Sequence, residues 1–178
     1  MAEPAGAARA LSNLIAAIDR LARGAAWLCA LATLACVALV SALVVARYAF
    51  SAGSQAVQEL VVWLHAGAFL FGLAWTLRED GHVRVDIFQQ RFPPRVAAWV
   101  EVAGGVLFLL PFCTFVVWMS WDYVAASWAV REGSREPGGL PALYLLKGML
   151  PAAAALLGLQ ALAQVLRALR RALGGADT

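Results

Sequence analysis

The sequence contains four long apolar stretches, separated by short segments that carry nearly all of its charge. The stretches cover approximately residues 25–46, 56–77, 100–121 and 143–166. A helix of about 20 apolar residues spans the roughly 30 Å hydrocarbon layer of a bilayer. A surface helix of a soluble protein would carry charge along one face, and residues 25–46 carry none. The sequence therefore predicts an all-α integral membrane protein with four transmembrane helices.

Length and composition limit this chain to one membrane domain. Of its 178 residues, 62% are hydrophobic and 14% are charged, so four spans leave little chain for a soluble domain. We expect residues 1–178 to form a single membrane domain. The net charge of +3 does not indicate a nucleic-acid partner, because the basic residues flank the spans instead of forming one basic face. We expect phospholipid to surround the membrane-spanning helices. The N-terminal residues do not have the pattern of a cleaved secretory signal, so the first span should be retained.

The distribution of lysine and arginine predicts the orientation of the chain. The N-terminal segment, the second loop and the C-terminus together hold ten basic residues, while the first and third loops, with Lys147, hold four. Short basic loops stay in the cytoplasm. Both termini and the second loop are therefore predicted to be cytoplasmic, and the first and third loops face outward. A multi-pass protein of the bacterial inner membrane fits this pattern.

The segment before the first span is amphipathic. Apolar residues recur at helical spacing and polar residues occupy most of the other face. This pattern predicts an N-terminal helix that lies in the membrane surface. The alternative is an ordinary helical lead-in to the first span. The apolar positions are Leu11, Leu14, Ile15, Ile18, Leu21 and Ala22.

Prolines and glycines mark the remaining local features. Pro111, near the middle of the third span, removes a backbone donor and predicts a kink. Pro94 suits the first turn of that helix, where a missing N–H is harmless. The third loop is rich in glycine and proline, so it is predicted to be irregular.

Three charged residues near the outer ends of the spans are candidates for interaction. Glu59 lies about one turn into the second span, and Lys147 lies at a similar depth in the fourth. Charges within the membrane usually face protein or water, so we expect Glu59 to pair with Lys147 or with Arg47. The alternatives are contact of these residues with lipid headgroups, and an ion-coupling role for the Glu59 carboxylate.

The sequence lacks the motifs of several function classes. It contains no phosphate-binding GxxxxGK[ST] loop, no HExxH zinc motif and no GxSxG nucleophile motif. His65 and His82 do not lie at one depth, as ligation of a haem between spans would require. We therefore expect no enzyme activity, no cofactor and no metal site. The pattern favours an accessory or scaffolding subunit of a larger membrane complex.

Short motifs spread over most of the chain resemble those of the small membrane subunit of TRAP transporters (tripartite ATP-independent periplasmic transporters, DctQ-like). The most specific is GHVRVD at residues 81–86, which is similar to the family's G-H-(I/V)-x-V-D. The other pieces, in chain order, are Arg47-Tyr48-Ala49-Phe50, Glu59-Leu60, Gly72 ten positions before His82, Gly139-Leu140-Pro141, Lys147, Pro151 and Gln160. The chain departs from the family before Glu59, where the usual tryptophan is missing and Gln58 replaces the first of two glutamates.

The resemblance implies a role in solute import. TRAP systems use an ion gradient, typically of sodium, to import solutes that are mostly organic acids. A periplasmic binding protein delivers the solute, and a large membrane subunit holds the substrate and ion sites. The small subunit would act as a scaffold for the large one, and would bind neither substrate nor sodium itself.

Three residues of the second loop are expected to lie together at the cytoplasmic end of the second span. We interpret His82, Arg84 and Asp86 as a local polar network that fixes this loop. The alternative is a solvated turn without a fixed network.

Two other functions compete with the transporter subunit. One is the membrane anchor of a redox enzyme, and the other is a small proton-coupled exporter that uses Glu59. The first would need paired histidines at one depth. Exporters of the second kind are shorter and carry their carboxylate deeper in the first span.

Overall fold

The structure is a computed structural model that describes residues 3–83 and 92–174. The described residues are helical, with irregular connections and no strand. Four helical segments are long and apolar enough to cross a membrane, as the sequence predicted. The elements are α1 (Glu3–Phe50), α2 (Gln55–Arg78), α3 (Pro94–Gly104), the π-helical turn η2 (Gly105–Leu109), α4 (Leu110–Ala129) and α5 (Leu143–Leu173).

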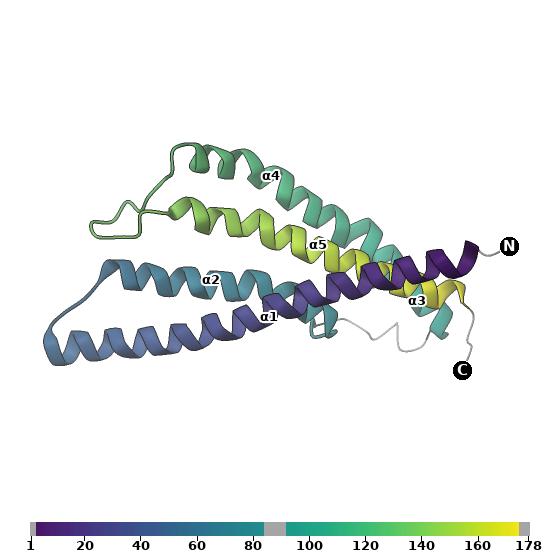
Figure 1. The fold of residues 1–178 in the computed structure, drawn as a ribbon, viewed down its shortest axis with the longest axis horizontal. Helices are drawn as coiled ribbons and strands as arrows, with labels where there is room; N and C mark the ends of the chain where they lie inside the picture. Colours follow the sequence, from purple (N-terminus) through teal and green to yellow (C-terminus); the bar gives the residue numbers. More distant parts are fainter. Residues whose placement is uncertain (1–2, 84–91, 175–178) are drawn as a thin grey trace.

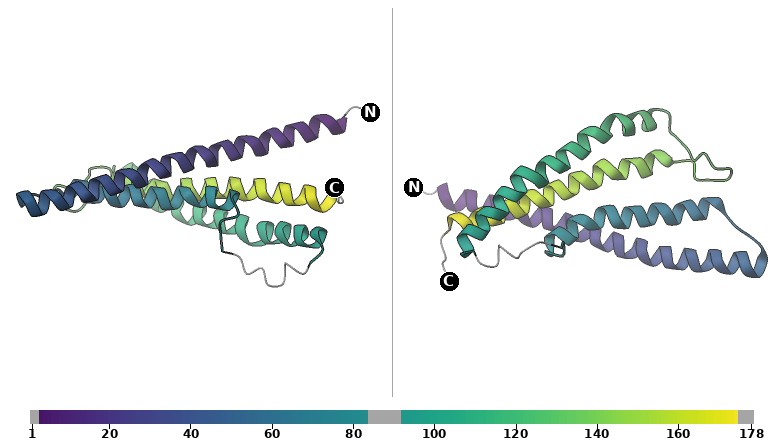
Figure 2. Two further views of the ribbon diagram at one scale, coloured as in Figure 1. Left: turned by 90° about the horizontal axis from the view of Figure 1, so that it is seen from below. Right: turned by 180° about the vertical axis from the view of Figure 1, so that it is seen from behind.

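The helices form two long hairpins, and α5 of the second hairpin also contacts the first (Figure 1). α1 pairs with α2, α4 pairs with α5, and α5 also packs against α1, α2 and α3. Both termini lie at the same end of the molecule, which we call the terminal end. The other end carries residues 51–54 and 130–142, and we call it the loop end. The two hairpins diverge toward the loop end in Figure 1 and in the rear view of Figure 2.

The first helix is one continuous element of 48 residues. At 1.5 Å per residue it is about 72 Å long, more than twice the thickness of the hydrocarbon layer. A separate in-plane helix before the first span was therefore not found. The helix continues through Gly24 because one glycine costs only about 1 kcal/mol relative to alanine. In Figure 2 α1 continues without a break to the terminal end, where α5 also ends.

The amphipathic pattern before the first span instead marks a contact between helices. Ile15 and Ile18 are 8% and 3% exposed, and both pack with Ala163 of α5. On the same apolar face, Leu14 and Leu21 remain 48% and 56% exposed. The pattern therefore describes a helix whose apolar face is covered by α5 only in part.

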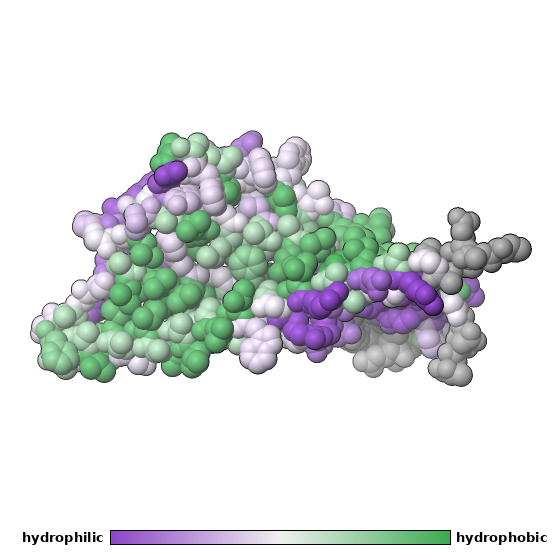
Figure 3. Space-filling view, viewed as in Figure 1, coloured by the Kyte–Doolittle hydropathy of each residue, from purple (hydrophilic) through white to green (hydrophobic). Residues whose placement is uncertain are grey.

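The outer surface of the bundle is largely apolar. Leu34 and Trp118, for example, are 67% and 74% exposed. Figure 3 shows hydrophobic residues over most of the α1–α2 hairpin, and hydrophilic residues gathered toward the terminal end. A soluble protein would bury such a surface, so this distribution agrees with four membrane-spanning segments.

The predicted kink at Pro111 corresponds to a local change of helix type. The π-helical turn η2 directly precedes α4, whose first turn contains Pro111. At its end the N–H of Leu110 donates to the Gly105 carbonyl, five residues back. π turns are among the ways in which a helix accommodates a disturbed hydrogen-bond ladder. Pro94 begins α3, as expected.

Gly105 allows η2 to approach α5 closely. A Cβ atom on Gly105 would lie 2.3 Å from Cγ2 of Val165, far inside van der Waals contact. A Cβ atom on the adjacent Gly104 would meet nothing within 4 Å. Val165 is β-branched and 8% exposed, so its side chain cannot easily rotate away.

These two glycines give a matched test of the fold. Gly105→Ala should destabilise the chain by about 1–3 kcal/mol through overpacking against Val165. Gly104→Ala should leave the stability unchanged or raise it by up to about 1 kcal/mol, because alanine favours helix. Thermal unfolding of both variants in the same detergent measures the difference. Equal melting temperatures for the two variants would contradict the described packing of η2 on α5.

Candidate functional site

The polar side chains that join different helices gather in two clusters, one at each end of the bundle. At the loop end, Glu59, which lies just after the first turn of α2, accepts hydrogen bonds from the loop that precedes α5. The Ser134 hydroxyl donates to one carboxylate oxygen, and the Leu140 N–H donates to the other at 2.8 Å. Glu59 thus fastens α2 to residues 130–142.

Lys147 has a different partner from the one expected. Its Nζ lies 2.5 Å from a carboxylate oxygen of Glu132 and 4.2 Å from the centre of the Tyr123 ring. Ser127 donates to the same Glu132 oxygen at 2.7 Å. These contacts join the end of α4, the loop and the first turns of α5. We call Glu59, Ser127, Glu132, Ser134 and Lys147 the loop-end cluster.

The expected ion pair of Glu59 with Lys147 or Arg47 was therefore wrong. Arg47 is exposed in the last turn of α1, and it makes no ion pair within the described residues. The physical reason is the path of the third loop. This loop brings Glu132 next to Lys147 and presents hydrogen-bond donors to Glu59. An estimate based on depth in the membrane cannot predict such a path.

Glu132 lies outside the membrane-spanning segments. Hydrogen bonds from Lys147 and Ser127 hold the pKa of its carboxyl below the ordinary value of 4.5. The ionised form of Glu132 is therefore the form that the loop-end cluster stabilises.

The loop at this end is irregular, as predicted, yet its backbone is ordered by hydrogen bonds. The N–H of Ser134 donates to the Leu140 carbonyl at 2.9 Å. Gly139 permits the fold of the loop, because a Cβ atom there would lie 2.4 Å from the Ser134 hydroxyl oxygen and 2.6 Å from a Glu59 oxygen. The absence of a side chain at Gly139 thus lets the loop close over Glu59.

A second cluster lies at the terminal end and joins three helices. Asp19 of α1 accepts a hydrogen bond from Arg167 of α5, which also forms an ion pair with it. Arg78 of α2 places its Nε atom 3.7 Å from the same Asp19 oxygen. Gln160 of α5 donates to Asp19 at 3.2 Å and is completely buried. We call these four residues the terminal cluster.

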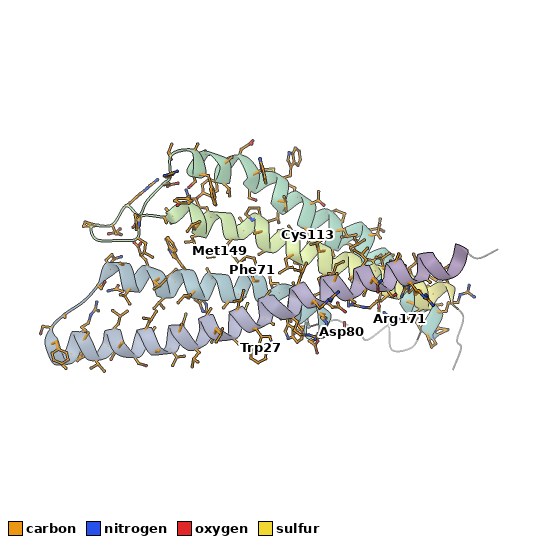
Figure 4. The ribbon with its side chains drawn as sticks, viewed as in Figure 1. Trp27, Phe71, Asp80, Cys113, Met149 and Arg171 are labelled. Carbon is orange, nitrogen blue, oxygen red and sulfur yellow. The ribbon has the colours of Figure 1, made fainter. Side chains whose placement is uncertain are left out.

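Further polar contacts surround the terminal cluster. They join the second loop to α5, α3 to α5, and the start of α1 to α5; Asp80 and Arg171 are labelled in Figure 4. The contacts are Gln164 to Asp80 at 3.0 Å, Arg171 to Glu101 at 2.7 Å, Arg95 to the Ala172 carbonyl at 3.0 Å and Arg170 to the Ala8 carbonyl at 3.1 Å. Sequence reasoning missed this end, because it placed the polar residues before the first span, Asp19 among them, on the polar face of a helix lying in the membrane surface.

His82 closes the end of α2. Its ring Nε2 donates to the Leu73 carbonyl at 3.3 Å, and the N–H of Gly81 donates to the Thr76 carbonyl at 2.9 Å. His82 thus folds back on the helix that precedes it. Arg84 and Asp86, the other members of the predicted network, lie outside the described residues.

Comparison with known proteins identifies the family. The model of the DctQ component of the tripartite ATP-independent periplasmic transporters matches residues 36–171. The chain belongs to this family. Comparisons with curated proteins and with solved structures gave no match. The whole loop-end cluster of this DctQ component lies within the matched residues, whereas Asp19 of the terminal cluster precedes them.

The lowered pKa of Glu132 predicts a pH dependence for the DctQ component. A carboxylate whose pKa is lowered by folding stabilises the folded state fully above its ordinary value of 4.5. This contribution is lost as the pH falls through the lowered value. Glu132→Gln should therefore reduce the melting temperature by a constant amount between about pH 7 and 5. Below pH 4.5 the difference from the unsubstituted protein should shrink.

Glu136→Gln is the matched control, because Glu136 is an exposed acid of the same loop. It should have little effect at any of these pH values. A melting-temperature difference for Glu132→Gln that stays the same down to pH 3 would contradict the described role of its carboxylate.

Proposed function

We propose that this DctQ component is the small permease subunit that braces a large TRAP membrane subunit during solute import. In this proposal the import is driven by an ion gradient, that of sodium, and the solute is an organic acid delivered by a periplasmic binding protein. The observation that carries the proposal is the family match over residues 36–171. The chain itself binds neither the solute nor the ion.

The polar clusters support the role of a brace. Helices in a bilayer gain little from burying apolar surface against one another, because lipid tails are equally apolar. Hydrogen bonds and ion pairs at the two ends therefore contribute much of what fixes the helices relative to one another. Asp19 ties α1 to α5 at the terminal end, and Glu59 ties α2 to the loop before α5. A scaffold whose helices are held at both ends can stay fixed while the large subunit moves during transport.

The orientation follows from the excess of basic residues at the terminal end. The termini are cytoplasmic in this proposal, and the loop end faces the periplasm of a bacterial cell. Residues 130–142 then present a hydrogen-bonded surface on the side where a binding protein would dock. In this proposal His82, Arg84 and Asp86 act together at the cytoplasmic loop, the last two of them outside the described residues. The outward-facing Arg47 lies near headgroups or a partner.

The contacts of Glu59 do not favour the alternative of a proton-coupled exporter. Each carboxylate oxygen already accepts a hydrogen bond from the loop. Protonation of Glu59 would weaken this contact between α2 and the loop, because hydrogen bonds to an ionised carboxylate are stronger than those to a neutral carboxyl group. A structural role for Glu59 agrees better with these two hydrogen bonds.

A reconstituted transporter tests the proposed function. The tagged chain should be co-expressed with a large TRAP membrane subunit from the same organism, purified, and placed in liposomes with the corresponding binding protein. We expect the two membrane proteins to co-purify. Solute uptake should require both of them, the loaded binding protein and an inward sodium gradient. Uptake by this chain alone, or uptake at an undiminished rate without it, would contradict the proposal.

Two glycine variants make the same experiment informative about the loop end. Gly139→Ala puts a Cβ atom against Ser134 and Glu59 and so disturbs the contact of the loop with α2, whereas Gly53→Ala adds a Cβ atom that meets nothing within 4 Å. Gly139→Ala should lower uptake when the binding protein is limiting and should leave co-purification intact. Gly53→Ala should change neither. Equal uptake by the two variants would remove the loop from the proposed docking surface.

A further inference from the structure

An apolar groove runs between α1 and α2. It has a volume of about 880 Å³, and Met149 and Leu156 of α5 also line it. Phe71 and Met149, labelled in Figure 4, are among the residues that line it from α2 and α5. All the residues that line it are uncharged except Arg20. Arg20 lies at the terminal end of the groove.

The α1 side of the groove is long enough for an acyl chain. From Arg20 to Ala35 it follows fifteen residues of helix, which is about 22 Å. One leaflet of a bilayer provides about 15 Å of hydrocarbon, half of the roughly 30 Å layer. A chain that enters beside Arg20 can therefore lie along α1 for the full depth of its leaflet.

Arg20 lies at the mouth of the groove, and a second arginine and a tryptophan lie beside it on α1. Arg20, Arg23 and Trp27 lie on one face of α1, because they are three and seven positions apart. Both arginines are exposed, and Trp27 is 70% exposed and points away from the bundle in Figure 4. Residues 20 and 23 immediately precede the apolar run that begins at residue 25. This is the depth at which lipid phosphates and interfacial tryptophans lie.

These two arginines differ from most others at the terminal end. The terminal-end arginines that have partners on other elements are Arg78, Arg95, Arg167, Arg170 and Arg171. Within residues 3–83 and 92–174, the hydrogen bond of the Arg20 side chain goes to the Ala16 carbonyl of its own helix, at 3.2 Å. Neither Arg20 nor Arg23 forms an ion pair with any residue that the structure describes.

We propose that the groove binds an anionic phospholipid of the leaflet at the terminal end. The phosphate lies against the guanidinium groups of Arg20 and Arg23, and one acyl chain lies between α1 and α2. Arginine suits this role because its planar fork of donors matches phosphate oxygens. Gly24 leaves room at the mouth, since a Cβ atom there would meet nothing within 4 Å. Basic pockets between membrane helices commonly bind anionic headgroups. The proposal does not depend on the function proposed above.

Lipid binding to the purified, delipidated chain tests this site. Native mass spectrometry in a neutral detergent should show tighter binding of phosphatidylglycerol than of phosphatidylcholine with the same acyl chains. Arg20→Gln and Arg23→Gln should each weaken the binding of phosphatidylglycerol about fivefold. Arg47→Gln is the matched control, because Arg47 is an exposed arginine at the other end of the same helix. It should have no effect.

Two further probes separate the headgroup from the acyl chain. Ala32→Phe fills the groove at a residue that lines it, and it should weaken the binding of both lipids. Glycerol phosphate, which has no acyl chain, should not compete with phosphatidylglycerol at equal concentration. Full competition by glycerol phosphate would overturn the proposal by showing a site for phosphate alone.

Two other outcomes would also overturn the proposal. One is equal binding of the two lipids by the unsubstituted chain. The other is equal loss of phosphatidylglycerol binding in Arg20→Gln and Arg47→Gln, which would indicate attraction by net charge instead of a site. If Ala32→Phe leaves lipid binding unchanged but disrupts co-purification with the large subunit, the groove holds a partner helix instead.

Discussion

The carboxylate of Asp19 is the point at which three helices of this protein are held together. It lies on α1 and meets Arg167 and Gln160 of α5 and Arg78 of α2. Apolar contact discriminates poorly between a neighbouring helix and lipid. Polar contacts do discriminate, because an unpaired charge or amide near the hydrocarbon is costly. The arrangement of α1, α2 and α5 at this end therefore depends on Asp19 more than on any single apolar contact.

The helix α5 is the common partner on which the rest of the bundle is built. It packs against α1, α2, α3 and α4, and it presents small buried residues such as Ala161 and Ala163 to them. Two glycines let the third membrane-spanning segment approach α5 closely. Gly105 of η2 faces Val165 of α5, and Gly158 of α5 faces Cys113 of α4. At the loop end, Glu59 and Lys147 add polar fastening to this packing. The family's scaffolding role is consistent with a bundle whose helices are joined in this way at both ends.

The spans were predictable because each is a run of apolar residues long enough to cross a bilayer. The predicted second span, residues 56–77, differs from α2 by one residue at each end. The separate N-terminal helix was not found, because periodicity alone cannot tell a lipid-facing stripe from one that packs on α5. The partner of Glu59 was missed because it comes from an irregular loop, whose path no hydrophobic pattern encodes.

The terminal cluster could have been anticipated in part. Asp19, Arg78 and Arg167 all flank predicted spans on the side that holds the termini. Opposite charges at one depth are candidates for pairing, yet depth alone does not give the rotation of each helix about its axis. Gln160 was noted only as part of a family resemblance, and its contact with Asp19 required the structure.

A double-mutant cycle on Asp19 and Arg167 tests the central claim most directly. The measurement is the free energy of unfolding of Asp19→Asn, of Arg167→Gln and of the double variant, in bicelles of one lipid composition. If Asp19 holds α1 to α5, the two substitutions should be coupled by about 0.5–2 kcal/mol, with the double variant less destabilised than the sum of the single ones. Additive effects, within about 0.3 kcal/mol, would contradict the account.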